Sequence, residues 1–386
     1  MHLRALLIVF VLSMARGQDR KIVTQLNPGC VGCGTDKTLM YIRAEGPKDT
    51  MHLVWDFIYG PPLITLVIGE TNSSLVVNWN GTSISDFFFN GTIKYSFFTS
   101  LYKLYEYNDT EDVGYMTPQS PYHYDSLEHL TWTRADAVLN DKEVMVRVDG
   151  HFRHKPGTVE VKLRYLPFTD YASDLPHLIH TANSTLVDVS LVNLTSSRRF
   201  NSSRFALNMV LLPTDIQQAD ELHFITRKSL DDEHTPGVFE IIEIKTPQSF
   251  AGEEGGYLQF RPVAYTDPKR EVSSSTNVHM SPFNNTGSNA ARVLRPLAVN
   301  KDIFGAQTFV SFGMPGDGFY TKHNYTAWSF TAGYGTPPVE GFSLFVIIII
   351  SIGLGVPVLL ALSGIIYVID KRYKQRNMPQ RLTDNE

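Results

Sequence analysis

Apolar and polar residues alternate with a period of two in several short runs of the chain. The alternation is clearest in residues 159–165, 185–191 and 239–244. In such a run one side of a strand faces a core and the other faces solvent. Other short runs are β-branched or aromatic and are bounded by Gly, Pro, Asn or Ser: residues 63–68, 74–79, 144–148 and 307–312. The pattern predicts an all-β region of the antiparallel β-sandwich type.

This β-rich region, residues 18–341, contains no long stretch with the apolar stripe of a helix. Its 324 residues (341 − 17) would crowd a single pair of sheets, because sandwich domains are usually shorter. We therefore expect two sandwich-like halves, with a sub-boundary near residues 167–176.

The longest apolar run lies near the C-terminus. Residues 342–369 contain no charged side chain, and a helix of that length rises about 42 Å, against about 30 Å for the hydrocarbon core of a bilayer. The run therefore predicts one transmembrane helix. Basic residues such as Lys371, Arg372 and Lys374 follow it and favour the cytosolic side, so residues 370–386 are expected to form a cytoplasmic tail.

The N-terminus has the pattern of a signal peptide. An arginine precedes an uninterrupted apolar run that ends at Leu12, and small residues stand at positions 15 and 17. The apolar run is too short to span a bilayer. We expect cleavage before Gln18, which makes the chain a type I single-pass membrane protein with residues 18–341 in the lumen.

Asn-x-Ser/Thr sequons are unusually frequent in the predicted lumenal region. There are nine, against roughly three expected by chance. Two of them are also Asn-Gly dipeptides, which favour exposed hairpin turns. The sequence therefore predicts a coat of N-glycans that shields the backbone from proteases. The nine asparagines are Asn72, Asn80, Asn90, Asn108, Asn183, Asn193, Asn201, Asn284 and Asn324.

Charge and motif content restrict the class of function. The formal net charge is −5, from 34 Lys and Arg against 39 Asp and Glu, which leaves no basic excess for nucleic acid. We find no nucleophile elbow, His-Glu-x-x-His, P-loop or dinucleotide motif. The pairs His151/His154 and His177/His180 would suit a metal only on a helix, whereas their surroundings predict strands or loops. We therefore expect no catalytic residue, cofactor or metal.

Two further motifs have more than one interpretation. The acidic residues 231–233 and His234 lack the spacing and glycine of a calcium loop, so we interpret them as a solvated loop, with a cation site as the alternative. Cys30 and Cys33 have the spacing of a redox dithiol, but the prolines and glycines around them do not open a helix. Two interpretations of these cysteines stay open: a local disulfide between them, or two free thiols.

Several stretches resemble the glycosylated lysosomal membrane protein family. They follow the family's order and extend from about residue 38 to the membrane helix, and the fourth and last in the list are the most specific. They are YIRA (41–44), HLVW (52–55), LVVNW (75–79), SLDDEHTPGVF (229–239), RPVAY (261–265) and WSFTAGYGTPPVEGFS (328–343).

The resemblance implies a non-enzymatic protein of the lysosomal membrane that acts as an accessory subunit. Its partner in the family is a lysosomal transporter of the major-facilitator type, which it stabilises against lumenal proteolysis and helps to localise. Family members have more lumenal cysteines, so no disulfide pattern is transferred. They also end in a Tyr-x-x-apolar sorting signal, whereas Tyr373 is followed here by Arg376, and Tyr367 by Asp370. As the alternative to a sorting signal in its own tail, the partner could carry the signal that directs both proteins to the lysosome.

The predicted membrane helix offers one candidate contact with such a partner. Ser351 and Gly355 are small residues four positions apart, so they share one face, where another helix could approach closely. Small residues also occur in membrane helices that have no partner, and homo-oligomerisation stays open. The alternative functions are a membrane-anchored lumenal hydrolase and a cell-surface ligand-binding receptor.

Overall fold

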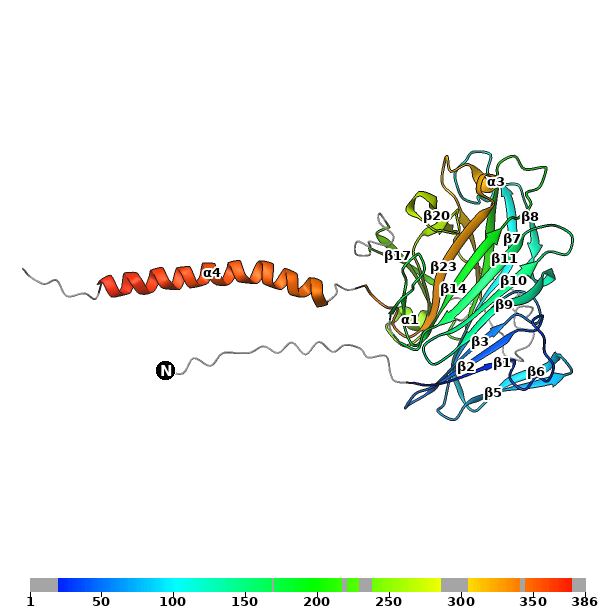
Figure 1. Cartoon of the computed structure of the whole chain (residues 1–386), viewed down its shortest axis with the longest axis horizontal. Helices are drawn as coiled ribbons and strands as arrows, with labels where there is room; N and C mark the ends of the chain where they lie inside the picture. The colour runs from blue at the N-terminus through cyan, green and yellow to red at the C-terminus, as the bar shows by residue number, and fades with distance from the viewer. Residues whose placement is uncertain are drawn as a thin grey trace, which may run out of the picture. The chain divides into compact units, whose positions relative to one another are not determined.

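The computed structural model describes residues 20–168, 170–216, 221–228, 238–285, 305–340 and 344–376. The contacts divide the chain into two compact units, with the division after Pro338. The first unit consists almost entirely of β-strands, and the second contains one long helix (Figure 1). The predicted signal peptide, residues 1–17, lies outside the described residues.

One set of antiparallel strands, here called sheet 1, forms the first layer of the β unit. Its strands are β1 (Lys21–Leu26), β2 (Leu39–Glu45), β3 (Thr50–Asp56), β4 (Leu63–Gly69), β7 (Ile93–Asn108), β8 (Tyr122–Ser126), β15 (Ser203–Pro213), β20 (Ser275–Met280), β21 (Asn284–Asn285) and β22 (Ala306–Phe312). The order across the sheet is β1, β2, β3, β4, β7, β15, β22. β8 pairs with the second half of β7, and β20 and β21 pair with β22.

A second set of antiparallel strands, sheet 2, forms the opposite layer. Its strands are β9 (Thr131–Leu139), β10 (Val144–His151), β11 (Thr158–Tyr165), β14 (Ser184–Val192), β16 (His223–Lys228), β17 (Glu240–Lys245), β18 (Gly256–Phe260), β19 (Val263–Tyr265) and β23 (Tyr325–Tyr334). The order is β9, β10, β11, β14, β23, β18, β17, β16. β20 pairs with β19 and with β22, so it joins the two sheets.

The core lies between the two sheets. Alternate side chains of each sheet point inward and form one continuous cluster. Val146, Val161 and Val187 belong to sheet 2, and Ile42 and Leu53 to sheet 1, and all five are at most 1% exposed. Full burial of such a side chain contributes about 1.5–3 kcal/mol. The alternation in residues 159–165 and 185–191 therefore predicted the core-facing side correctly.

A third layer covers the outer face of sheet 1. It is the hairpin of β5 (Ser74–Asn80) and β6 (Ser83–Asn90), here called the hairpin layer. Trp79 and Phe89 of this hairpin pack with buried side chains of sheet 1, among them Val54 and Phe98. Sheet 1 is thus covered on both faces there, which explains why every residue of β3 and β4 is buried and why residues 63–68 show no alternation.

The antiparallel sandwich is confirmed, but as one sandwich and not as two halves. The expected sub-boundary near residues 167–176 lies inside the first unit. Each sheet takes strands from both sides of that region, because β7 pairs with β15 and β14 pairs with β23. Length alone suggested two halves, whereas a third layer and long strands such as the 16-residue β7 accommodate the chain in one sandwich.

The remaining elements are short, apart from the helix of the second unit. The short ones are β12 (Asp170–Tyr171), β13 (Ile179–His180), α1 (Pro247–Phe250), α3 (Phe319–His323) and the 3₁₀ turns at Leu127–His129 and Val272–Ser274. Helix α4 (Leu344–Arg376) covers residues 344–369 of the predicted span and continues seven residues beyond Ile369 (376 − 369), whereas residues 342–343 lie outside the described residues. Within the described residues it is the single helix long and apolar enough to cross a membrane.

Candidate functional site

Most of the predicted glycosylation sites lie on the surface of the sandwich. Seven of the nine sequon asparagines are exposed, and Asn108 and Asn183 are half-buried. Asn72, Asn80 and Asn90 lie on the hairpin layer or the turns next to it. The two Asn-Gly dipeptides are at turns, where Gly81 and Gly91 have positive φ angles of 63° and 97°, so the expected turns are present.

Four more sequons gather at one end of the sandwich, here called the α3 end, where β23 begins. Asn193 donates its backbone N–H to the carbonyl oxygen of Asn324 at 2.8 Å, so these two sites are neighbours. The side-chain oxygen of Asn108 accepts a hydrogen bond from the N–H of Ser202, which follows Asn201, at 3.0 Å. Asn183 lies at the opposite end, where its carbonyl oxygen accepts the N–H of Tyr334.

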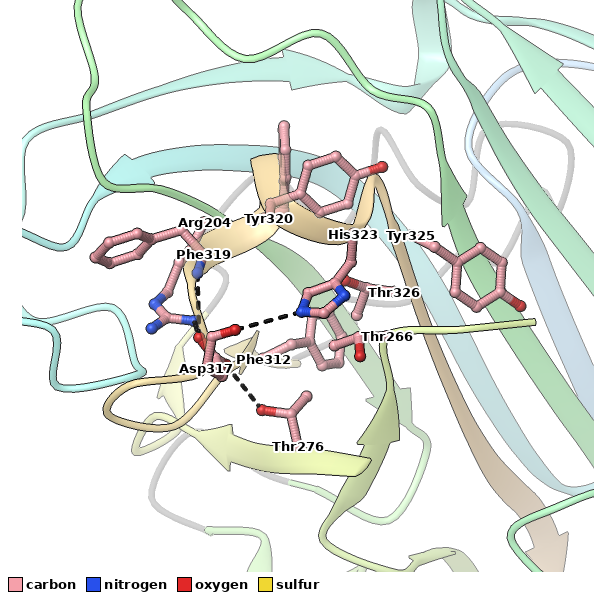
Figure 2. A pocket seen from close by; sticks show the side chains of 11 residues that line it. Arg204, Thr266, Thr276, Phe312, Asp317, Phe319, Tyr320, His323, Tyr325 and Thr326 are labelled. Atoms are coloured by element: carbon pink, nitrogen blue, oxygen red, sulfur yellow. Dashed lines mark hydrogen bonds and ion pairs between the residues drawn. The ribbon is translucent and has the colours of Figure 1, made fainter. Parts of the chain in front are cut away.

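The α3 end also contains a buried cluster of charges (Figure 2). Arg204 of β15 donates from Nε to Asp109 at 2.8 Å, from one terminal nitrogen to Asp317 at 2.7 Å and from the other to Asp112 at 2.6 Å. The Arg204 side chain is 3% exposed, and its guanidinium lies 4.8 Å from the ring centre of Phe319. One arginine therefore connects β15, the loop after β7 and the turn before α3.

The acidic members of this cluster are hydrogen-bonded beyond the arginine. Asp317 accepts the backbone N–H of Met314 and the hydroxyl of Thr276. Burial alone would raise the pKa of Asp317, but the Met314 N–H and the Arg204 guanidinium outweigh burial and hold that pKa below its usual range. The carboxylate of Asp317 is therefore ionised and paired. Because a general acid must carry a proton, this state fits a structural ion pair better than a catalytic acid.

A second set of arginines holds a segment across the outer face of sheet 2. This segment, residues 170–182, is here called the strap. Arg270 donates to the carbonyl oxygen of Leu175 at 3.0 Å, and Arg261 donates to that of His177 at 3.1 Å. Arg164 lies 3.2 Å from a carboxylate oxygen of Asp174. The proline-containing region near residues 167–176 thus belongs to a segment that is held against sheet 2, and it is not a linker between two domains.

The four candidate histidines do not converge. The ring of His177 is tilted against that of Tyr171, with ring centres 6.1 Å apart. His180 is fully buried, and neither of its ring nitrogens has a hydrogen-bond partner. Burial, with a smaller contribution from the charge of Arg164, lowers the pKa of His180 to about 4. His151 is exposed at the end of β10, and His154 lies in the loop that follows.

In the part of the chain that the structure describes, no three His, Cys, Asp or Glu side chains lie close enough together to bind a metal ion. Residues 231–234, the acidic candidate, lie outside the described residues.

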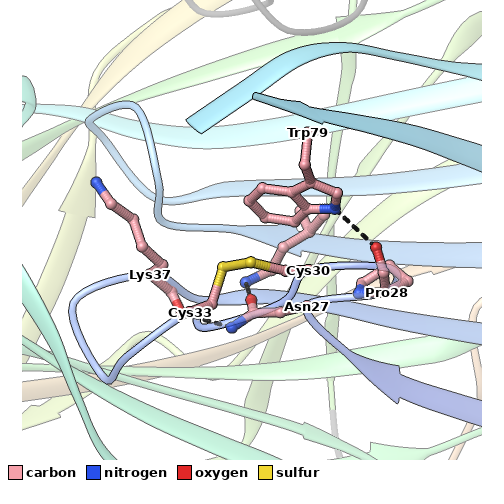
Figure 3. The surroundings of a disulfide bond; sticks show 7 residues. Asn27, Pro28, Cys30, Cys33, Lys37 and Trp79 are labelled. Carbon is pink, nitrogen blue, oxygen red and sulfur yellow. Dashed lines mark hydrogen bonds between the residues drawn. A yellow bond between two sulfur atoms is a disulfide. The ribbon is translucent and has the colours of Figure 1, made fainter. Parts of the chain in front are cut away.

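Cys30 and Cys33 form a disulfide with their Cα atoms 6.0 Å apart (Figure 3). The loop is held at its start by Asn27, whose side chain accepts the N–H of Leu39 and donates to the carbonyl oxygen of Lys37. The indole N–H of Trp79 donates to the carbonyl oxygen of Pro28 at 2.8 Å. The disulfide therefore closes a local loop that is fixed to the hairpin layer.

Enclosed space for a small ligand is scarce in the described pockets. The pocket at the α3 end, beside Arg204 and Asp317, has a volume of about 20 Å³, and the one beneath Leu175 and Pro176 of the strap about 10 Å³. Small-molecule sites are usually 300–1,000 Å³ and enclose most of the ligand. A groove of about 410 Å³ beside Phe239 is open to solvent. Of these three described pockets, only the open groove has the volume of a usual small-molecule site.

The candidate contact residues of the membrane helix both lie on α4. Ser351 is exposed in this chain, and apart from the neighbouring backbone of α4 itself no atom lies within 4 Å of the position that a Cβ on Gly355 would occupy. Both residues are therefore accessible to another helix in the bilayer.

Comparison with known proteins agrees with these features. The family model described as glycosylated lysosomal membrane protein matches residues 38–375. Glycosylated lysosomal membrane protein A of Xenopus laevis is 30% identical, covering 93% of this chain and 92% of that protein. The proteins of that name from Mus musculus and Homo sapiens are 28% and 26% identical, covering 89% and 93% of this chain and 87% and 90% of their own lengths. The chain belongs to the glycosylated lysosomal membrane protein family, and it is a lysosomal membrane protein with a β-rich lumenal region and one candidate span.

Proposed function

We propose that this chain is a non-enzymatic accessory subunit of a multi-spanning lysosomal transporter of the major-facilitator type. It binds the transporter, protects it from lumenal proteases and supports its location in the lysosome. The observation that supports this most strongly is the distribution of sequons, which lie on the hairpin layer and at both ends of the sandwich. Glycans at these places would cover the hairpin layer and the two ends of the sandwich and hinder the approach of a protease there.

The shape of the described pockets supports a binding role over catalysis. A hydrolase needs a cleft that holds its substrate next to a nucleophile or a pair of acid and base. The pocket beside Arg204 has room for about one water molecule, and its acidic side chain, Asp317, is held ionised. The ion pairs of Arg204 with its carboxylates therefore hold segments of the sandwich together and do not form an active site.

Affinity purification of the full-length chain from lysosomal membranes in a mild detergent tests the partner. We expect mass spectrometry to find one multi-spanning transporter in a ratio near one to one. A matched variant, Ser351→Leu with Gly355→Leu, tests the helix, because two bulky side chains would hinder close approach of a second helix. Recovery of the chain without any transporter would contradict the proposal, and undiminished recovery with the variant would assign the contact to the lumenal sandwich.

Enzymatic removal of the N-glycans is expected to shorten the survival of the chain and of the transporter. Without glycans, turns such as Asn80-Gly81 and the neighbouring sites Asn193 and Asn324 are open to proteases. The measurement compares digestion by lysosomal cathepsins at about pH 5 before and after deglycosylation, with heat-inactivated glycosidase as the control. No loss of mass on deglycosylation, or equal survival of both samples, would contradict the protective role.

A further inference from the structure

The outer face of sheet 2 differs from the rest of the sandwich in having almost no sequons. Residues 109–182 and 202–283 contain none, and these two segments supply β9, β10, β11, β16, β17, β18 and β19. Three sequons flank the strands β14 and β23 of this sheet: Asn183, half-buried at one end, and Asn193 and Asn324 at the α3 end. A face that stays free of glycans on a heavily glycosylated protein is accessible to another protein surface.

The chain leaves the sandwich on this same face. Leu258 and Phe260 of β18 point into the core, so Gln259 between them points outward. Its side-chain nitrogen donates to the carbonyl oxygen of Pro338 at 2.8 Å. Only five residues separate Pro338 from Leu344, where α4 begins, so the point at which the chain leaves this face is close in sequence to the candidate membrane span.

Two ion pairs lie on this face beside the strap. Arg270 lies 2.7 Å from Asp188, and Lys162 lies 2.9 Å from Asp174. Burial alone would raise the pKa of Asp174, but the neighbouring Lys162 outweighs burial and lowers that pKa. The carboxylate of Asp174 therefore stays paired as the pH falls below neutral, and the part of the face beside the strap presents little unpaired charge to a partner.

Exposed aromatic rings lie around the strap. Phe168 is 40% exposed, Tyr171 44% and Phe239 48%. One guanidinium, that of Arg261, donates to the carbonyl oxygens of His177 and Val238, so the strap and the open groove beside Phe239 adjoin. Aromatic side chains are enriched in the centres of protein interfaces, because they bury a large area at a low cost in conformational entropy.

We propose that the outer face of sheet 2, with the strap and the adjoining groove, is the surface that binds the lumenal loops of the membrane-embedded partner. The expected partner surface is a protein surface of low net charge with apolar side chains that fit the groove of about 410 Å³ beside Phe239. This inference rests on the proposed function, and it assigns that function to one face of the sandwich.

A new glycan on this face tests the proposal. Tyr171→Asn creates the sequon Asn-Ala-Ser at residues 171–173, and the added sugar would exclude a protein from the strap. We expect the recovery of the transporter with the full-length variant to fall about tenfold or more, equal to a loss of about 1.4 kcal/mol. Gel mobility before and after deglycosylation shows that the glycan is attached.

Two matched controls separate the glycan from its position. Tyr171→Gln removes the same ring without adding a sequon, and it is expected to bind the transporter with at most a small loss. Ser83→Asn creates the sequon Asn-Ile-Ser at residues 83–85, on the exposed side of the hairpin layer, and it is expected to bind like the unmodified chain. If Tyr171→Asn does not fold, a separate variant takes its place. Arg147→Asn with Asp149→Thr creates the sequon Asn-Val-Thr at residues 147–149 of β10, on the same outer face.

Each outcome has one meaning. Loss with the Tyr171 glycan but not with the controls supports the proposed face. Equal recovery with all variants overturns it and leaves the proposed function intact. If the unmodified chain recovers no transporter, the proposed function fails and this inference fails with it. If the Tyr171 glycan instead abolishes recovery of a second, differently tagged copy of the chain, the face belongs to self-association and the proposal is overturned.

Discussion

Replacement of Arg204 by methionine is expected to lower the free energy of unfolding by about 3–5 kcal/mol, the cost of breaking a buried ion pair by removing one partner. The substitution leaves the carboxylates of Asp109, Asp112 and Asp317 close together without their shared cation. Two of these side chains, Asp109 and Asp317, are at most 10% exposed, so water compensates poorly for the loss. Chemical denaturation of the full-length chain in detergent, followed by tryptophan fluorescence, measures the effect.

A surface pair provides the matched control for Arg204. Arg147 lies 3.6 Å from Asp149 and its side chain is 45% exposed, so Arg147→Met is expected to change the free energy of unfolding by less than about 1 kcal/mol. A similar small change for Arg204→Met would show that the three carboxylates are stable without the arginine, and would contradict the role of Arg204 as a tie between three segments.

The tie at Arg204 is also expected to tolerate acid. The pKa of Asp317 is lower in the folded chain than in the unfolded chain. Its stabilising contribution is therefore complete above the unfolded pKa and is lost only as the pH falls through the lower, folded pKa. At any lumenal pH above that folded-state pKa, the carboxylate of Asp317 stays charged and paired with Arg204.

Replacement of His180 by leucine is expected to make the protein less sensitive to acid. Because burial lowers the pKa of His180 from 6.5 to about 4, the unfolded chain binds the proton more readily, and the histidine destabilises the fold as the pH falls from 6.5 toward 4. From these two pKa values the cost at about pH 5 is about 2 kcal/mol. Leucine removes that cost, since neither ring nitrogen of His180 has a partner to lose.

The measurement is the difference in unfolding free energy between about pH 7.5 and pH 5, which should shrink by about 2 kcal/mol in His180→Leu. The exposed His151 provides the control, because His151→Leu makes the same chemical change at a side chain that the fold does not bury. His52 is a contrasting case: it is also buried with a pKa lowered to about 4, but its ring nitrogens lie 2.8 Å from the hydroxyls of Tyr41 and Ser73. An unchanged pH dependence in His180→Leu would contradict the argument.

The sequence predicted the parts of the fold that depend on local pattern. The strands β11, β14 and β17 followed from alternation, although most outward side chains of β14 and β17 are buried as well, and the turns at Asn80 and Asn90 followed from their glycines. The pairing of strands did not follow, because β7 and β15 are neighbours although about a hundred residues separate them. The third layer also removes the alternation from β3 and β4, so their two buried faces cannot be read from a pattern of period two.

The charged cluster and the buried histidine were not predicted for a related reason. Arg204 contacts Asp109 and Asp317 across 95 and 113 residues, and no motif links positions so far apart. His180 was identified as one member of a pair, but its burial depends on a strap that arginines from other strands hold in place. The excess of sequons needed no tertiary information, because the sequon is a local signal.

The position of β23 has a consequence for biosynthesis. This last strand lies in the interior of sheet 2, between β14 and β18, so the sandwich cannot close until residue 334 has been translocated. Asn72 therefore waits for 262 more residues (334 − 72), about 13–50 s at a synthesis rate of 5–20 residues per second. During that interval oligosaccharyltransferase meets an extended chain, and Asn108 and Asn183, which the finished fold half covers, are as accessible to the enzyme as any other site.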